Sequence, residues 1–159
     1  MSELRTNRIV PRDGLTSGSY GGIIQVRYAS NTDSQSSTSS TMADVTGASV
    51  TITPTRADSA ILIMLTFSGN NAASGGGRLQ YRVRRSVGGS ESTIFSVDEA
   101  LVDYGTSNIH VQGLGNNFID TPSTTSAVTY KLQFATHNGT QVQVNNNGRT
   151  DLIVMEIAG

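Results

Sequence analysis

Apolar and polar residues alternate one by one along much of this chain, and this period of two constrains the fold more than any other feature. Leu79, Tyr81 and Val83 alternate with polar residues, and so do the apolar residues between positions 128 and 134. Such alternation places one row of side chains on each face of a β-strand. No stretch of a dozen residues carries a convincing 3.6-residue repeat, so the sequence predicts an all-β fold.

Residues that favour turns separate the predicted strands. Pairs such as Gly88-Gly89 and Asn138-Gly139 tolerate the positive φ that tight hairpins require. The best single hairpin prediction is at Asn138-Gly139, joining residues 127–136 to residues 141–145. Roughly eight short strands at this spacing favour an antiparallel β-sandwich, jelly-roll-like in its arrangement.

Four segments depart from simple alternation. Residues 61–65 and 152–155 are apolar at every position, so we expect both faces of these strands to be covered. Residues 30–41 contain no apolar side chain, which predicts an exposed connection. Residues 1–20 are too short for a core of their own, so we expect an anchoring or oligomerisation segment ahead of a sandwich domain spanning residues 21–159.

Composition excludes several classes of protein. A chain of 159 residues has room for one domain. The net charge of −1 provides no field to attract a nucleic acid, and no apolar run approaches the length needed for membrane insertion. The chain has no Cys and its N-terminus lacks the apolar region of a secretory signal, which predicts assembly in a reducing cytoplasm.

No motif predicts an enzyme. Asp98, Glu99 and Asp103 could supply a carboxylate pair for glycoside hydrolysis, but nothing else converges on them and a solvated loop is the favoured interpretation. The two histidines have no spacing typical of a metal site. Arg82 and Arg84 share one strand face, where we expect an ion pair with an acidic neighbour. We therefore predict no catalytic residue, no cofactor and no metal.

Several segments resemble structural proteins of tailed-phage virions. The opening LRTNRIVPRDG (residues 4–14) and SYGGIIQV (residues 19–26) resemble the entry into such domains. DTPSTTSAVTYK (residues 120–131), an Asn-Gly turn, VQVN (residues 142–145) and LIVMEIA (residues 152–158) form an ordered series similar to the terminal β-sandwich of fibre-like proteins from marine and cyanobacterial phages. The resemblance covers about residues 4–26, 48–66 and 118–159, whereas residues 67–117 show none.

This resemblance implies a homotrimeric virion component, made in the host cytoplasm, that projects from the particle and serves attachment to a host surface glycan or protein. Residues 1–20 would contact other virion proteins. The expected subunit or virion contacts are Leu4, Ile9, Val10, Ile23, Ile24 and Val26, and the expected receptor contacts are Tyr104, Asn108, His110, Asn116 and Asn117.

Two alternatives stay open from the sequence. Because the sandwich follows a leader of only about 20 residues, a capsid decoration or head-fibre protein that stabilises the shell without binding a receptor is the main competing hypothesis. A small polysaccharide depolymerase is the other, and it would depend on the carboxylates near position 98.

Overall fold

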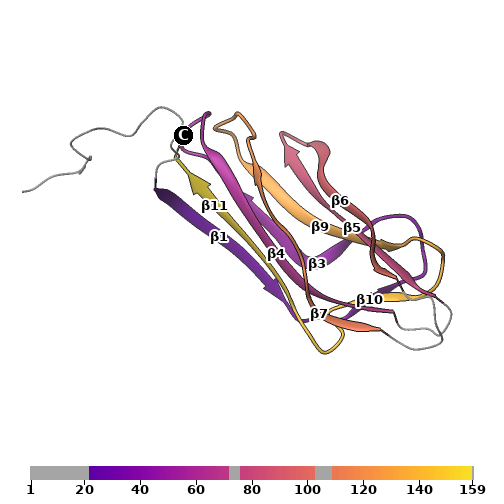
Figure 1. Ribbon diagram of the computed structural model, residues 1–159. Coiled ribbons are helices and arrows are strands. Elements are labelled where there is room, and N and C mark those ends of the chain that lie inside the picture. The colour runs from indigo at the N-terminus through magenta and orange to yellow at the C-terminus, as the bar shows by residue number, and fades with distance from the viewer. Residues whose placement is uncertain (1–21, 72–75, 103–108, 159) are drawn as a thin grey trace, which may run out of the picture.

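The computed structural model describes residues 22–71, 76–102 and 109–158, and it arranges them as β-strands and connecting loops without a helix (Figure 1). Two antiparallel sheets pack face to face, so the predicted all-β sandwich is confirmed. The strands are β1 (Ile23–Asn31), β2 (Gln35–Ser37), β3 (Ala43–Ile52), β4 (Ala60–Asn71), β5 (Arg78–Val87), β6 (Ser90–Val102), β7 (His110–Leu114), β8 (Asn117–Asp120), β9 (Val128–Thr136), β10 (Val142–Val144) and β11 (Thr150–Ile157).

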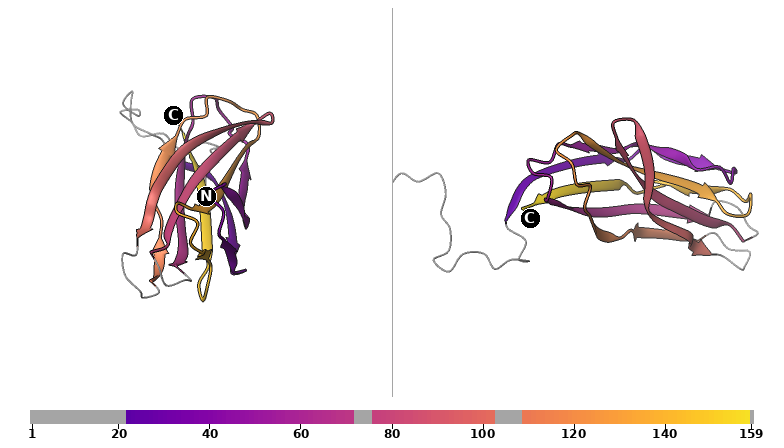
Figure 2. Two further views of the ribbon diagram at one scale, coloured as in Figure 1. Left: turned by 90° about the vertical axis from the view of Figure 1, so that its right-hand side faces the viewer. Right: turned by 90° about the horizontal axis from the view of Figure 1, so that it is seen from above.

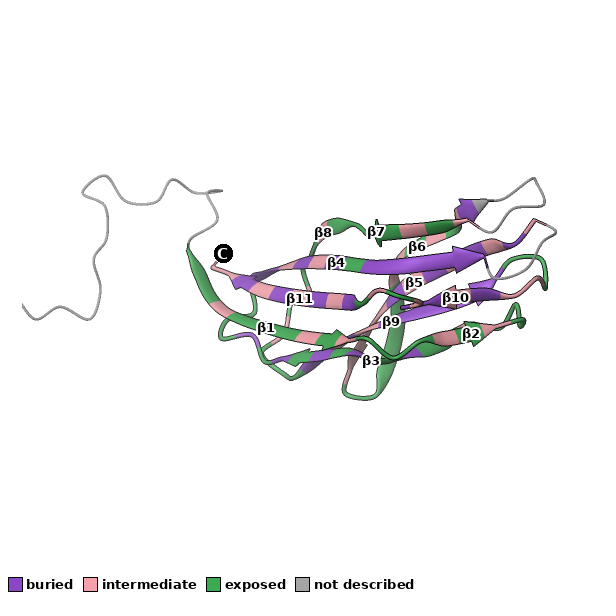
Figure 3. Cartoon of the chain, turned by 90° about the horizontal axis from the view of Figure 1, so that it is seen from below, coloured by how far each residue is buried: buried purple, intermediate pink, exposed green. Residues whose placement is uncertain are grey.

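The first sheet is built around the long strand β4. One side of β4 pairs with β11 and then β10, and its other side pairs with β8 and then β7. Strands β1 and β2 form the edge next to β11 and β10. In three places two strands lie end to end, β1 with β2, β11 with β10 and β8 with β7. The seven strands of this sheet therefore occupy four adjacent rows (Figure 3).

The second sheet contains β3, β9, β5 and β6 in that order. Strands β5 and β6 form a tight hairpin in which Val87 pairs with Ser90 across Gly88 and Gly89. Both glycines have positive φ, 56° and 85°, as a two-residue hairpin turn with matching twist requires. The views in Figure 2 show that the strands of the two sheets run broadly along the long axis of the molecule.

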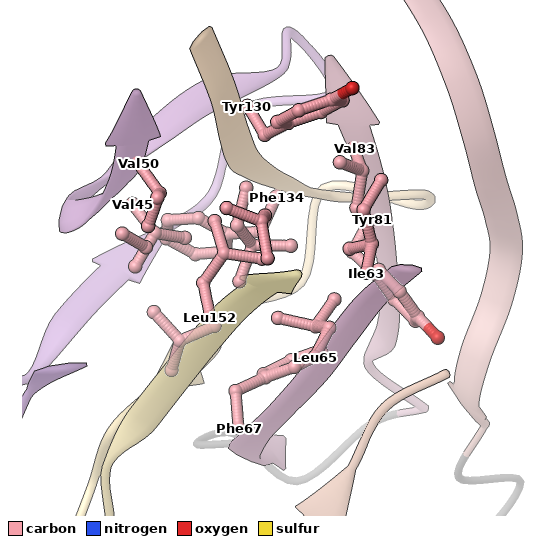
Figure 4. Packing of buried hydrophobic residues seen from close by; sticks show 14 of the residues in the cluster. Val45, Val50, Ile63, Leu65, Phe67, Tyr81, Val83, Tyr130, Phe134 and Leu152 are labelled. Atoms are coloured by element: carbon pink, nitrogen blue, oxygen red, sulfur yellow. The ribbon is translucent and has the colours of Figure 1, made fainter. Parts of the chain in front are cut away.

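The hydrophobic core lies between the two sheets. Leu65, Phe67 and Leu152 of the first sheet face Tyr81 and Phe134 of the second (Figure 4), and all five are at most 3% exposed. The alternating apolar residues of β5 and β9 that the sequence singled out are all buried here. Alternation therefore predicted correctly which side of these strands faces inward.

Polar side chains also join the two sheets. The carboxylate of Asp120, at the end of β8, accepts hydrogen bonds from Arg85 Nη1 at 2.8 Å and from the Tyr130 hydroxyl at 2.7 Å. Tyr130 is fully buried, and burial together with the Asp120 carboxylate raises the pKa of its hydroxyl. This group is consequently held protonated as a hydrogen-bond donor between the layers.

The hairpin predicted at Asn138-Gly139 is wrong. The turn exists, and Gly139 has a φ of 81°, but β9 belongs to the second sheet whereas β10 pairs with β4 and β2 of the first. The turn is held instead by His137 N, which donates to Arg78 O at 2.8 Å, and by Asn138 Nδ2, which donates to Gly76 O at 2.6 Å. Turn chemistry predicts a change of direction but not which strand becomes the partner.

The prediction of an exposed connection at residues 30–41 is wrong in part. Strand β1 extends to Asn31, and β2 forms inside this segment by pairing with β10. A polar strand can form there because its backbone, rather than its side chains, makes the contacts with β10. The expected anchoring segment, residues 1–20, lies outside the described residues.

Candidate interaction surface

The outer face of the second sheet is polar, and several of its charged side chains form ion pairs. The Glu91 carboxylate forms ion pairs with Lys131 Nζ at 2.7 Å and with Arg84 Nη2 at 3.2 Å. Lys131 Nζ also lies 3.3 Å from the carboxylate of Asp44. The hydrogen bond from Lys131 holds the pKa of the Glu91 carboxyl below its ordinary value. The ion pair expected for the arginine stripe is thus present at Arg84, while Arg82 donates to Gln133 Oε1 at 2.7 Å. This is a face suited to water.

The outer face of the first sheet is apolar over its half nearest the C-terminus. Strand register places Val26, Met155, Leu62 and Ile119 side by side across all four rows. The adjacent line contains Tyr28, Ile153 and Met64, and Ile23 lies opposite Ile157. We call this surface the apolar face; its members are Ile23, Val26, Tyr28, Leu62, Met64, Ile119, Ile153, Met155 and Ile157.

The apolar face is open to solvent in a single chain. Tyr28 is 76% exposed, Ile23 60%, Ile119 51% and Val26 44%, and the other five members are half-buried. The expectation that residues 61–65 and 152–155 are covered on both sides is therefore wrong for the isolated chain, since only one side of each strand faces the core (Figure 3). Exposed apolar patches of several hundred Å² mark interaction sites in soluble proteins.

An open groove adjoins the apolar face where three rows of the first sheet are interrupted. It has a volume of about 750 Å³, and every non-glycine side chain around it carries a hydroxyl, amide, guanidinium or carboxylate group. The lining residues are Thr32, Ser34, Thr66, Ser68, Gln112, Gly113, Asn145, Asn146, Asn147, Gly148, Arg149 and Asp151. We call this the polar groove.

The connection between β10 and β11 forms much of the polar groove. Asn145 and Asn147 have positive φ, 60° and 53°, which asparagine tolerates better than most residues. Asn145 is anchored from three sides: its N donates to Ser68 O at 3.0 Å, its Nδ2 to Asp33 O at 3.3 Å, and its Oδ1 accepts from Thr150 Oγ1 at 2.8 Å. Sequence reasoning treated this segment only as a turn.

The predicted subunit contacts fall into two groups. Ile23, Ile24 and Val26 lie on the edge strand β1 and are all exposed, with Ile23 and Val26 in the apolar face. Leu4, Ile9 and Val10 lie outside the described residues. Sequence reasoning missed Tyr28 and Ile119, although the doubly apolar strand at residues 61–65 was the signal that a second covered face should exist.

The predicted receptor contacts do not form the polar groove. His110, Asn116 and Asn117 are exposed at β7 and β8, and Asn116 accepts a hydrogen bond from the Tyr81 hydroxyl. His110 approaches the groove only through Gln112, whose Nε2 lies 3.4 Å from His110 Nε2. Tyr104 and Asn108 lie outside the described residues. Whether any of these residues contacts a receptor stays a prediction.

Two of the three carboxylates considered for glycoside hydrolysis lie on a strand rather than on a loop. Asp98 and Glu99 are exposed on β6, and Glu99 forms an ion pair with Arg78 at 2.5 Å; Asp103 lies outside the described residues. Among residues 22–71, 76–102 and 109–158, no group of three or more His, Cys, Asp or Glu could hold a metal ion. The same residues contain no helix that could cross a membrane.

No protein-family model matches this sequence, and a comparison with curated proteins finds no relative.

Proposed function

We propose that this protein is a non-enzymatic structural component of a tailed-phage virion, a homotrimeric jelly-roll sandwich that projects from the particle and takes part in attachment to the host. The observation that carries the proposal is the apolar face, because a displayed domain with one water-suited face and one apolar face requires a partner. The resemblance of residues 4–26, 48–66 and 118–159 to structural proteins of tailed-phage virions supplies the phage context.

The strand order supports the jelly-roll assignment. If strands that continue one another's lines are counted as one, eight rows remain, and successive rows mostly alternate between the two sheets. The first and last rows, β1 with β2 and β10 with β11, lie side by side in the same sheet. We interpret this order as two interlocked Greek keys, the jelly-roll architecture also found in viral capsid proteins.

We propose a second copy of this chain as the occupant of the apolar face. The four most exposed members and the five half-buried ones leave a continuous, mainly apolar area on the order of a few hundred Å² uncovered. A standard interface buries about 800 Å² per partner, a little over half of it apolar, so the area is of the size that one subunit interface needs. None of the nine side chains carries a charge, so in a trimer the apolar face could be shared between the two neighbouring copies around a threefold axis without burying an unpaired charge.

The mass of the full chain in solution tests this proposal. We expect a trimer of about 50 kDa, three times the chain mass of 16.8 kDa, in sedimentation equilibrium. Val26→Asp should produce monomers, because an unpaired carboxylate buried in the interface costs about 3 kcal/mol or more. The matched control is Ser96→Asp, which places the same charge on the exposed outer face of the second sheet opposite Arg82 and should leave the trimer intact.

A monomeric wild-type chain at micromolar concentration would contradict the proposed use of the apolar face, and a dimer would contradict the threefold symmetry. Location separates the main proposal from its alternative. Labelled protein at the tail supports attachment, whereas labelled protein on the capsid supports a decoration or head-fibre protein that stabilises the shell. Contacts of residues 1–20 with other virion proteins remain part of the proposal.

A further inference from the structure

We infer that the polar groove is a binding site for a neutral saccharide. The inference deepens the proposed function, on which it rests, by naming the class of ligand that attachment would use and the place where it binds. The groove and the apolar face are different surfaces of the first sheet, so each can be tested without the other.

Several hydrogen-bonding side chains that line the groove have no partner among the residues that the structure describes. Within the described part of the chain, the side chains of Thr32, Ser34, Thr66 and Asn147 make no hydrogen bond. Ser68 is 1% exposed, and its Oγ is buried beside the groove without a partner. A ligand rich in hydroxyl groups, each a donor and an acceptor, would satisfy this excess of unpaired polar groups.

The charges of the groove lining favour an uncharged ligand. The only guanidinium of the lining, that of Arg149, is 2.6 Å from the carboxylate of Asp151, so the pair is neutral as a whole. A phosphate or sulfate would have to displace Asp151 from its partner, and a divalent cation would find a single carboxylate. The absence of large apolar side chains from the lining disfavours the aromatic and aliphatic ligands that most small-molecule pockets accept. An uncharged polyhydroxylated molecule fits all three conditions.

The groove is held in shape before any ligand arrives. Gln112 Nε2 donates to Asn147 O at 3.0 Å and ties β7 to the connection between β10 and β11. Gly148 must lack a side chain, because a Cβ there would lie 2.3 Å from Ser68 Oγ. The walls are therefore positioned by the sheet rather than by a free loop, which reduces the entropy lost on binding.

Glycan binding by the full chain tests the inference. The probe is an array that displays neutral oligosaccharides beside sialylated, sulfated and phosphorylated ones, followed by calorimetric titration with the neutral oligosaccharide bound best. We expect binding to neutral glycans and a loss of about threefold to tenfold in affinity for Thr66→Val and for Ser34→Ala, each of which removes one unpaired hydroxyl. Ser96→Ala, which removes an exposed hydroxyl from the outer face of the second sheet, should bind as the wild type does.

Three results would overturn the inference: no neutral glycan bound, binding confined to anionic glycans, or neutral binding that Thr66→Val and Ser34→Ala leave unchanged. Sedimentation of the same variants keeps the two proposals apart. A trimer that binds no neutral glycan refutes only the saccharide site, and a monomer that binds one refutes only the interface.

Discussion

Replacement of Glu156 by glutamine tests how a buried carboxylate holds three segments of this fold together. Glu156 lies on β11, points inward and is 0% exposed. Its Oε1 accepts hydrogen bonds from Thr55 N at 2.7 Å and Thr55 Oγ1 at 2.8 Å, and its Oε2 accepts one from Gln25 Nε2 at 2.6 Å. The side chain thereby connects β11 to the edge strand β1 and to the loop that follows β3.

The expected loss of stability in Glu156→Gln follows from these hydrogen bonds. In Glu156→Gln, the amide oxygen can keep both bonds from Thr55, but the new NH₂ group then faces the NH₂ group of Gln25. Gln25 cannot turn its amide over without cost, because Nε2 also donates to Thr53 O at 2.7 Å. One charge-assisted hydrogen bond is lost and two donors face each other, so we expect the free energy of unfolding to fall by about 2 kcal/mol at neutral pH.

The effect should depend on pH in a defined direction. Burial pushes the pKa of Glu156 upward, but the hydrogen bonds from Gln25 and Thr55 outweigh it and leave the pKa below its ordinary value of 4.5. A carboxyl whose pKa is depressed by folding stabilises the native state fully above the pKa of the unfolded chain, and this contribution is lost as the pH falls through the folded value. The stability difference between the two proteins should therefore be largest near pH 7 and shrink below pH 4.5.

Urea unfolding at pH 7 and at a pH below the ordinary Glu value, followed by far-ultraviolet circular dichroism, measures this difference. Both proteins must be compared at one concentration, because association stabilises the folded state. Equal stabilities at pH 7, or a difference that stays constant as the pH falls, would refute the assignment of a charged, hydrogen-bonded Glu156. Other carboxylates titrate in both proteins and largely cancel in the comparison.

Two further substitutions test the packing between the sheets and within the first sheet. Tyr130→Phe removes the hydroxyl that donates to Asp120 and should lower the free energy of unfolding by about 1–2 kcal/mol in urea titration; an unchanged midpoint would show that this bond contributes nothing net. Gly115→Ala would place a Cβ 1.9 Å from the carbonyl oxygen of Leu65, so we expect a loss of about 1–3 kcal/mol in thermal unfolding, whereas Gly22→Ala, with nothing within 4 Å, should be neutral.

The positions and inward faces of strands such as β5 and β9 could be predicted from the sequence because both are local properties. Alternation at residues 79–83 and 128–134 indicates which side of each strand faces water. The double glycine at positions 88 and 89 permits the positive φ that a two-residue turn requires. Strand pairing is different. Asn138-Gly139 has equally good turn chemistry, yet the chain crosses there to the other sheet, since pairing depends on which edges are free after the remaining strands have packed.

The surfaces proposed for function required the tertiary structure. The sequence by itself determined that residues 61–65 and 152–155 have two apolar sides, but only strand register placed Val26, Met155, Leu62 and Ile119 in one line on the outer face. The polar groove is less predictable still, because its lining comes from four separate parts of the chain and consists of ordinary turn residues. The alternation of apolar and polar residues determines which side chains each strand has on its two sides. Long-range packing decides which strands become neighbours, and hence which side chains combine into a surface.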